Sequence, residues 1–106
     1  MRRHFVLLLC LPAFALAQTP AKPAKLGQCV ACHGSDGRSR IAGTPHLAGQ
    51  DETYLASALA AYRSGARRAA IMNSIANTLQ PRDIAALARW YARQPAGGPA
   101  RPQAQQ

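Results

Sequence analysis

Aromatic residues, acidic residues and long apolar runs are all scarce in this 106-residue chain. Only 6% of the residues are aromatic, so one small domain would have a marginal core unless a covalent group adds to it. Four acidic residues stand against thirteen basic ones. The apolar run at residues 5–17 is shorter than the roughly 20 residues that a membrane-spanning helix needs. A permanent membrane anchor is therefore not favoured.

The first seventeen residues have the layout of a secretory signal. A basic start, Met1-Arg2-Arg3-His4, precedes the apolar run, which closes on the small-residue pattern Ala15-Leu16-Ala17. We therefore predict that residues 1–17 are a signal peptide, that the mature chain begins at Gln18, and that it is exported to the periplasm. A lipid anchor on Cys10 is disfavoured because the residue before it is not small.

Without Arg2 and Arg3, eleven basic residues remain against four acidic ones, a formal charge of +7. In an exported protein we expect this charge to meet an acidic face of a partner protein or the anionic headgroups of a membrane surface, and not nucleic acid. The same charge would also serve simply to keep the chain soluble. The sequence does not separate these roles.

One short motif carries chemistry: Cys29-Val30-Ala31-Cys32-His33. Thiols three residues apart share one face of a helical turn, so both sulfurs can reach the two vinyl groups at one edge of a porphyrin. The histidine can then ligate the iron from one side. This spacing is the attachment signature of a c-type haem. Because the motif occurs once, we predict one haem c per chain, held by Cys29 and Cys32 and ligated by His33.

Met72 is the only methionine left after signal removal, and it lies in a non-periodic stretch. A buried methionine is more often core filler than a ligand, but this one belongs to no hydrophobic stripe. We predict that its thioether is the second axial ligand of the iron. His46 is the competing ligand, although its neighbours Pro45 and Leu47 indicate a loop on the His33 side of the ring.

The periodicity elsewhere is helical, with no strand alternation. One helix is expected to open with Asp51 and Glu52 and to stop at Gly65. Its buried face would carry Tyr54, Leu55, Ala58, Leu59 and Tyr62. A second is expected to begin near Pro81 and to end by Pro95. Its buried face would carry Ile84, Leu87, Ala88 and Tyr91, with Trp90 beside them. A third, short helix should lead into and through the cysteine motif.

We therefore predict an all-α fold of three to four helices in a domain over residues 26–94. An extended leader over 18–25 precedes it and a disordered tail over 95–106 follows it, because both segments are rich in proline and small residues.

Taken together, these segments resemble a class I c-type cytochrome, in particular the small bacterial domains of the cytochrome c-four and c-five branch. The matching segments are Cys29–Gly34, Pro45–Gln50, Tyr54-Leu55, Arg63–Arg67, Met72 and Asp83–Tyr91. The resemblance implies the small cytochrome c fold, with helices wrapped around one covalently bound haem and with His33 and Met72 as axial ligands. It also implies that the first and last helices cross through Leu87 and Trp90. The carbonyl of Pro45 would accept a hydrogen bond from the other ring nitrogen of His33.

The chain departs from that family just before the motif. The family usually has a glycine and an apolar or aromatic residue one and two turns ahead of the first haem cysteine, where this chain has Ala21 and Lys25. The resemblance therefore implies a weaker helix crossing here.

For each of four polar residues the sequence leaves two interpretations open. Asn73 or Asn77 would either bond near the Met72 sulfur or face solvent. Arg38 and Arg40 would either pair with haem propionates or be solvated.

With both axial positions filled, the iron has no open site, so we expect a one-electron carrier and not an enzyme. Its partners would be redox proteins, a dehydrogenase or reductase as donor and an oxidase or reductase as acceptor, that dock briefly on a monomer. Arg63, Arg67 and Arg68 would steer the encounter.

Two alternatives stay open: a five-coordinate haem enzyme or sensor that binds gas or peroxide, and the haem subunit of a periplasmic dehydrogenase. Other interpretations of the cysteines are weaker. Structural zinc needs four ligands, a redox dithiol needs a βαβ scaffold, and a disulfide leaves His33 unexplained.

Overall fold

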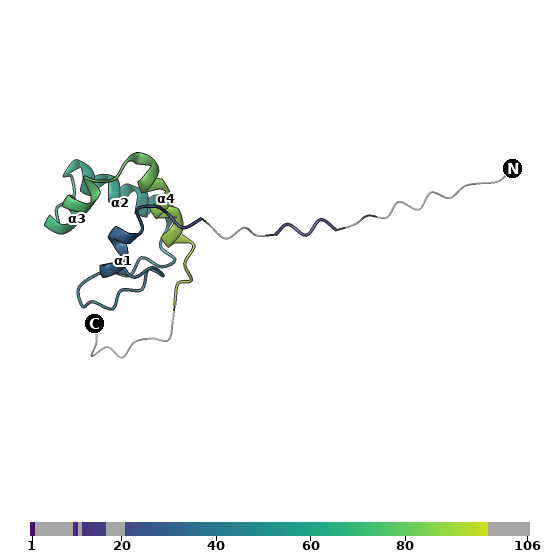
Figure 1. Cartoon of the computed structure of the whole chain (residues 1–106), viewed down its shortest axis with the longest axis horizontal. Coiled ribbons are helices and arrows are strands. Elements are labelled where there is room, and N and C mark those ends of the chain that lie inside the picture. Colours follow the sequence, from purple (N-terminus) through teal and green to yellow (C-terminus); the bar gives the residue numbers. More distant parts are fainter. Residues whose placement is uncertain (2–9, 11, 17–20, 98–106) are drawn as a thin grey trace.

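The structure, a computed structural model, describes residues 1, 10, 12–16 and 21–97. It contains the helices α1 (Gly27–His33), α2 (Glu52–Ser64), α3 (Ala70–Ala76) and α4 (Pro81–Ala92), with no strand among the described residues. The predicted all-α fold is confirmed. Figure 1 shows α2, α3 and α4 gathered on one side, with α1 and the loop that follows it beside them. In this part of the chain, no helix is both long and apolar enough to span a bilayer.

Most of the predicted signal peptide and most of the predicted tail lie outside the described residues, as does the first part of the predicted leader.

The two long helices begin and end where local chemistry predicts. Asp51 precedes α2, and its side chain accepts a hydrogen bond from the N–H of Tyr54 at 2.8 Å. Gly65 ends α2 in the left-handed conformation. Pro81 opens α4, where a missing N–H is harmless, and the Asp83 carboxylate accepts the N–H of the preceding Gln80 at 2.8 Å.

Met72, placed by the sequence in a non-periodic stretch between two helices, lies within a short helix that the sequence did not predict, α3. A single side chain organises the turn into that helix. The amide of Asn73 donates to the carbonyls of Tyr62 at 2.7 Å and Arg67 at 2.9 Å, and its oxygen accepts the N–H of Ala69 at 2.9 Å. Asn73 thus ties the end of α2 to the start of α3. A seven-residue helix with one buried residue, Ala76, has no hydrophobic stripe to detect.

The core lies between α2 and α4 and includes the segment before α4. Its buried apolar side chains are Leu26, Leu55, Ala76, Leu79, Ile84, Leu87, Ala88 and Tyr91. The predicted buried face of α4 is confirmed in full. Tyr54, predicted to face inward from α2, is 51% exposed, and its hydroxyl lies 3.5 Å from the Arg67 guanidinium.

Leu26 supplies the apolar contact that Ala21 and Lys25 do not. The chain turns just before α1, with the N–H of Leu26 donating to the carbonyl of Pro23 at 3.1 Å, and Leu26 is then 1% exposed. It packs against the core cluster that contains Leu87. The end of the predicted extended leader is therefore a turn, and it anchors α1 to α4.

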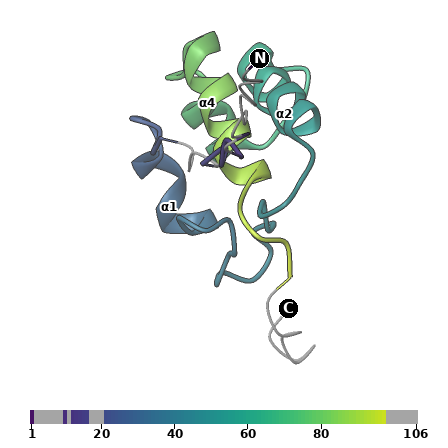
Figure 2. The same cartoon turned by 90° about the vertical axis from the view of Figure 1, so that its right-hand side faces the viewer.

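A long loop, residues 34–50, connects α1 to α2 and crosses itself at Gly37. The carbonyl of Gly37 accepts the N–H groups of Leu47 at 2.7 Å and Ala48 at 3.1 Å. A Cβ on Gly37 would lie 2.6 Å from the nitrogen of Ala48. Figure 2 shows the end of α4 descending toward this loop.

Gly37→Ala should destabilise the protein more than Gly43→Ala. Both glycines have positive φ, +74° and +80°, but only Gly37 is crowded; no atom lies within 4 Å of a Cβ on Gly43. Gly43→Ala should therefore cost only the backbone strain, about 1–2 kcal/mol, and Gly37→Ala should add a clash of about 1–3 kcal/mol. Denaturant unfolding of the two variants measures the difference, and equal losses would show that the crossing can relax.

Candidate haem site

The cysteine motif lies on α1. Cys29 and Cys32 are half-buried, unbonded thiols three residues apart on this helix. Burial raises the pKa of the Cys29 thiol, and a hydrogen bond with Tyr91 offsets part of the rise. Both sulfurs are therefore free for two thioether bonds, and the pair is not a disulfide.

His33 is the last residue of α1 and is 7% exposed. Its ring nitrogen Nδ1 lies 2.9 Å from the carbonyl oxygen of Pro45. A carbonyl only accepts hydrogen bonds, so Nδ1 must carry the proton. The lone pair is then on Nε2, which is the nitrogen left to bind a metal. The contact that the resemblance implied is thus present.

Gly34 makes the contact between His33 and Pro45 possible. Its φ of +76° reverses the chain directly after α1, and a Cβ there would lie 2.8 Å from Asp36 Oδ1 and 2.9 Å from the carbonyl oxygen of Arg38. Only glycine fits this position. The reversal lets the loop return over the end of α1.

Two aromatic residues of α4 donate hydrogen bonds to the same reversal. The Tyr91 hydroxyl donates to the carbonyl of Gly34 at 2.9 Å, and the Trp90 indole nitrogen donates to the carbonyl of Ser35 at 2.8 Å. The sequence analysis assigned both residues to packing alone. The sequence could not predict these two hydrogen bonds, because the acceptors are backbone carbonyls more than fifty residues away.

Met72 is half-buried on α3. This helix packs against α2 and has no extensive contact with α1. A hydrogen bond at 2.8 Å between the side chains of Thr78 and Gln28 links the segment after α3 to α1. The two predicted iron ligands therefore come from separate helices that are not packed on each other, which a planar group ligated from both faces requires.

The residues present fit a covalently attached haem. Two free thiols, an imidazole with Nε2 available and a thioether make up the donor set that such a group needs. Apolar side chains on α1, on the loop after it and on α3 also remain uncovered: Val30 is 37% exposed, Ile41 48% and Ile71 71%. Across the described part of the chain, no three His, Cys, Asp or Glu side chains cluster as a metal site.

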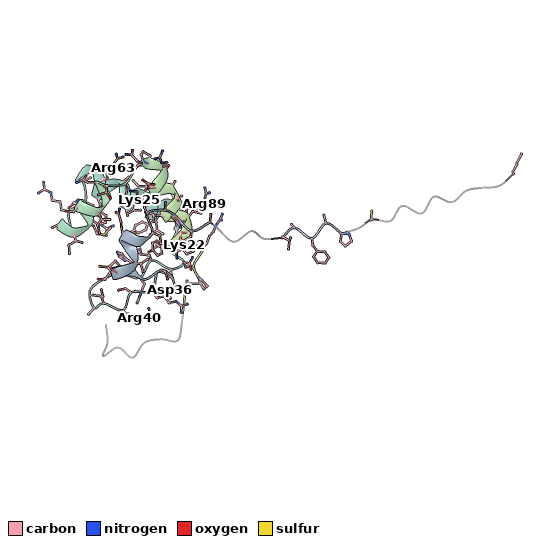
Figure 3. The ribbon with its side chains drawn as sticks, in the orientation of Figure 1. Lys22, Lys25, Asp36, Arg40, Arg63 and Arg89 are labelled. Carbon is pink, nitrogen blue, oxygen red and sulfur yellow. The ribbon has the colours of Figure 1, made fainter. Side chains whose placement is uncertain are left out.

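Three further residues of the loop can now be located. His46 is exposed, in agreement with its assignment to a loop. Arg38 donates to the carbonyl of Pro95 at 3.1 Å and so holds the chain beyond α4 against the loop. Arg40 is exposed, and Figure 3 shows it at the loop end of the folded part.

Comparison with known proteins places this geometry in context. Residues 21–94 match the cytochrome c family. Cytochrome c-554(548) of Halomonas halodenitrificans is 47% identical over 73 residues, 66% of this chain and 88% of that protein. The thiosulfate dehydrogenase electron acceptor of Thiomonas intermedia is 41% identical over 88 residues, 81% of this chain and 41% of that protein. Cytochrome c4 of Pseudomonas aeruginosa is 37% identical over 82 residues, 77% of this chain and 41% of that protein. The chain thus spans about two fifths of the latter two relatives.

Replacing both motif cysteines, Cys29→Ala with Cys32→Ala, should leave the chain largely unfolded. Without thioether bonds the haem is not retained, and the apolar side chains that face it lose their contacts. Circular dichroism during a thermal melt measures this. Cys10→Ala is the matched control, since that cysteine lies outside the motif, and it should leave haem content and melting unchanged. A cooperative melt of the double variant would contradict the expectation.

Proposed function

Since this chain belongs to the cytochrome c family and is a monohaem electron carrier, we propose that His33 and Met72 are the axial ligands of the haem c that Cys29 and Cys32 attach. The observation that carries this proposal is the 2.9 Å contact between His33 Nδ1 and the Pro45 carbonyl oxygen, which leaves Nε2 for the iron. When bound, the haem supplies one-electron transfer between the ferric and ferrous states.

The chain's own residues act on that iron in two ways. The hydrogen bond to Pro45 orients the His33 ring and increases its donor strength. The thioether of Met72 favours the ferrous state and so raises the reduction potential. With both positions filled, no site is left for a small substrate, so we propose that the protein transfers electrons and does not catalyse a reaction itself.

The acidic residues are too few to balance the basic ones, and only one of them forms a salt bridge in the described part of the chain. All four carboxylates are engaged within the chain: three accept hydrogen bonds from backbone N–H groups, and Glu52 pairs with Arg89 at 3.4 Å. That pair is the one salt bridge in the described part of the chain. The remaining basic side chains are therefore not neutralised internally. We propose that they attract redox partners with acidic docking faces.

Three arginines near α3 are suited to this role. Arg63 lies in the last turn of α2, and Arg67 and Arg68 follow before α3. The guanidinium of Arg67 lies 4.8 Å from the ring centroid of Tyr62, which holds it in place while its charge remains exposed. These residues precede Met72 in the chain by four to nine positions. We propose them as the steering group for partner encounter.

The partner classes and location follow as further parts of the proposal. The relative from Thiomonas intermedia is named as an electron acceptor of a dehydrogenase, which supports a dehydrogenase as electron donor here. The basic and apolar start with its Ala15-Leu16-Ala17 ending supports export of a monomeric domain to the periplasm. A role as the haem subunit of a periplasmic dehydrogenase would be revealed by co-purification with that enzyme.

Met72→Ala should convert a six-coordinate haem to a five-coordinate one. The oxidised wild type should show the weak far-red absorption band of sulfur-ligated ferric haem, and the variant should lose it and bind carbon monoxide readily when reduced. Ser74→Ala, an exposed polar position on the same helix, is the control and should retain the band. Carbon monoxide binding by the wild type at the rate of the variant would favour the enzyme or sensor alternative.

Neutralising the steering group should slow electron transfer to an acidic-faced partner. Arg63→Gln, Arg67→Gln and Arg68→Gln together should lower the second-order rate constant about tenfold or more at low ionic strength and flatten its salt dependence. Figure 3 shows Arg63 far from Arg40, at the other end of the folded part. The combined variant Lys22→Gln, Arg40→Gln and Arg89→Gln removes the same charge elsewhere. Equal slowing by both sets, measured by stopped flow, would mean that only net charge matters.

A further inference from the structure

One residue of α4 holds both ends of the loop that carries Pro45. The hydroxyl of Tyr91 donates to the carbonyl of Gly34 at 2.9 Å, directly after His33. The backbone carbonyl of the same tyrosine accepts the N–H of Gly49 at 3.0 Å, shortly after Pro45. The span of the loop between these two points is therefore fixed by a single residue.

Trp90 and the loop crossing complete the support. The Trp90 indole nitrogen donates to the carbonyl of Ser35 at 2.8 Å. The ring of Tyr91 lies against Gly37, whose carbonyl accepts the N–H groups of residues 47 and 48 at 2.7 and 3.1 Å. Hydrogen bonds and packing thus form a closed path from α4, through the reversal after α1, to the segment that carries the Pro45 carbonyl.

The direction of these hydrogen bonds is fixed. The acceptors are carbonyl oxygens, which cannot donate, and the indole N–H cannot accept. Tyr91 is 3% exposed, and this burial raises the pKa of its hydroxyl, so the hydroxyl stays protonated and donates. The bond from the Tyr91 hydroxyl is partly buried, so losing it leaves the Gly34 carbonyl less well satisfied, and losing the more exposed bond from Trp90 removes a second fixed donor from the loop.

We propose that Tyr91 and Trp90 are positioning residues for His33, which set the strength of the hydrogen bond from its Nδ1 to the Pro45 carbonyl. The inference rests on the proposed ligation of iron by His33. A stronger bond at Nδ1 makes Nε2 a stronger donor and favours ferric iron, so a looser loop should favour ferrous iron and raise the reduction potential. Neither aromatic residue touches the iron in this scheme; both act through the loop.

Two single substitutions in the holoprotein test the proposal. Tyr91→Phe removes one hydroxyl and keeps both the ring on Gly37 and the backbone bond to Gly49. Trp90→Phe removes the indole N–H and serves as the second variant if the first does not fold. The readouts are exchange of the His33 Nδ1 proton with deuterated water, followed by nuclear magnetic resonance in the ferrous state, and the reduction potential. Each lost hydrogen bond should accelerate exchange about fivefold, and the potential should rise.

The control is Tyr54→Phe, because the Tyr54 side chain is 51% exposed and its hydroxyl contacts Arg67 at 3.5 Å and no carbonyl of the loop. It should leave exchange and potential unchanged. A purely structural role for Tyr91 and Trp90 would lower the melting temperature while both readouts stay at the wild-type values, and this result would overturn the positioning role alone. A wild type without a His33 ligand signal would instead overturn the proposed ligation, and the positioning role with it.

Discussion

The hydrogen bond between His33 Nδ1 and the Pro45 carbonyl is the constraint on which the site depends. It joins residues twelve positions apart. His33 lies at the end of α1, and the direction of that helix carries the chain away from Pro45. The chain must therefore reverse at once, and Gly34 at positive φ is the residue that allows this reversal. The return path then has to pass close to its own start, which Gly37 permits. Gly34 and Gly37 are thus required by one imidazole orientation.

The same constraint links the site to the small core. Tyr91 is the one aromatic residue among the buried core side chains, and it also donates to the loop. Its ring contributes to the packing of α4, while its hydroxyl satisfies the Gly34 carbonyl. Because the chain has so few aromatic residues, the same residue serves both the packing of the core and the geometry of the site. Changes in core packing around α4 should therefore alter the position of the His33 ring, and loss of the haem should destabilise the core.

Sequence patterns predicted the helix ends that depend only on neighbouring residues. Asp51, Gly65 and Pro81 mark helix ends by chemistry confined to a single turn, and the structure has those ends. The α3 helix was not predicted, because its start depends on the side chain of Asn73 reaching back to α2. Leu26 was missed for a similar reason: one apolar residue after a proline has no periodicity, and only the turn before α1 directs it into the core. The two cysteines and His33 were predicted from motif spacing, and Met72 as the only methionine left after signal removal, whereas the support of the His33 loop by α4 required the fold.

The surplus of positive charge is set by composition, thirteen basic side chains against four acidic ones. Three acidic side chains serve as caps or in a turn, and among the described residues Glu52 alone forms a salt bridge, with Arg89. Charge balance on this surface must then come from a partner or from solvent ions. Since Figure 3 shows Arg40, Arg63 and Arg89 on different parts of the fold, attraction alone would leave the orientation of a partner undefined. The orientation of a partner therefore has to come from local features. Arg67, whose guanidinium lies over the Tyr62 ring just before α3, is such a feature.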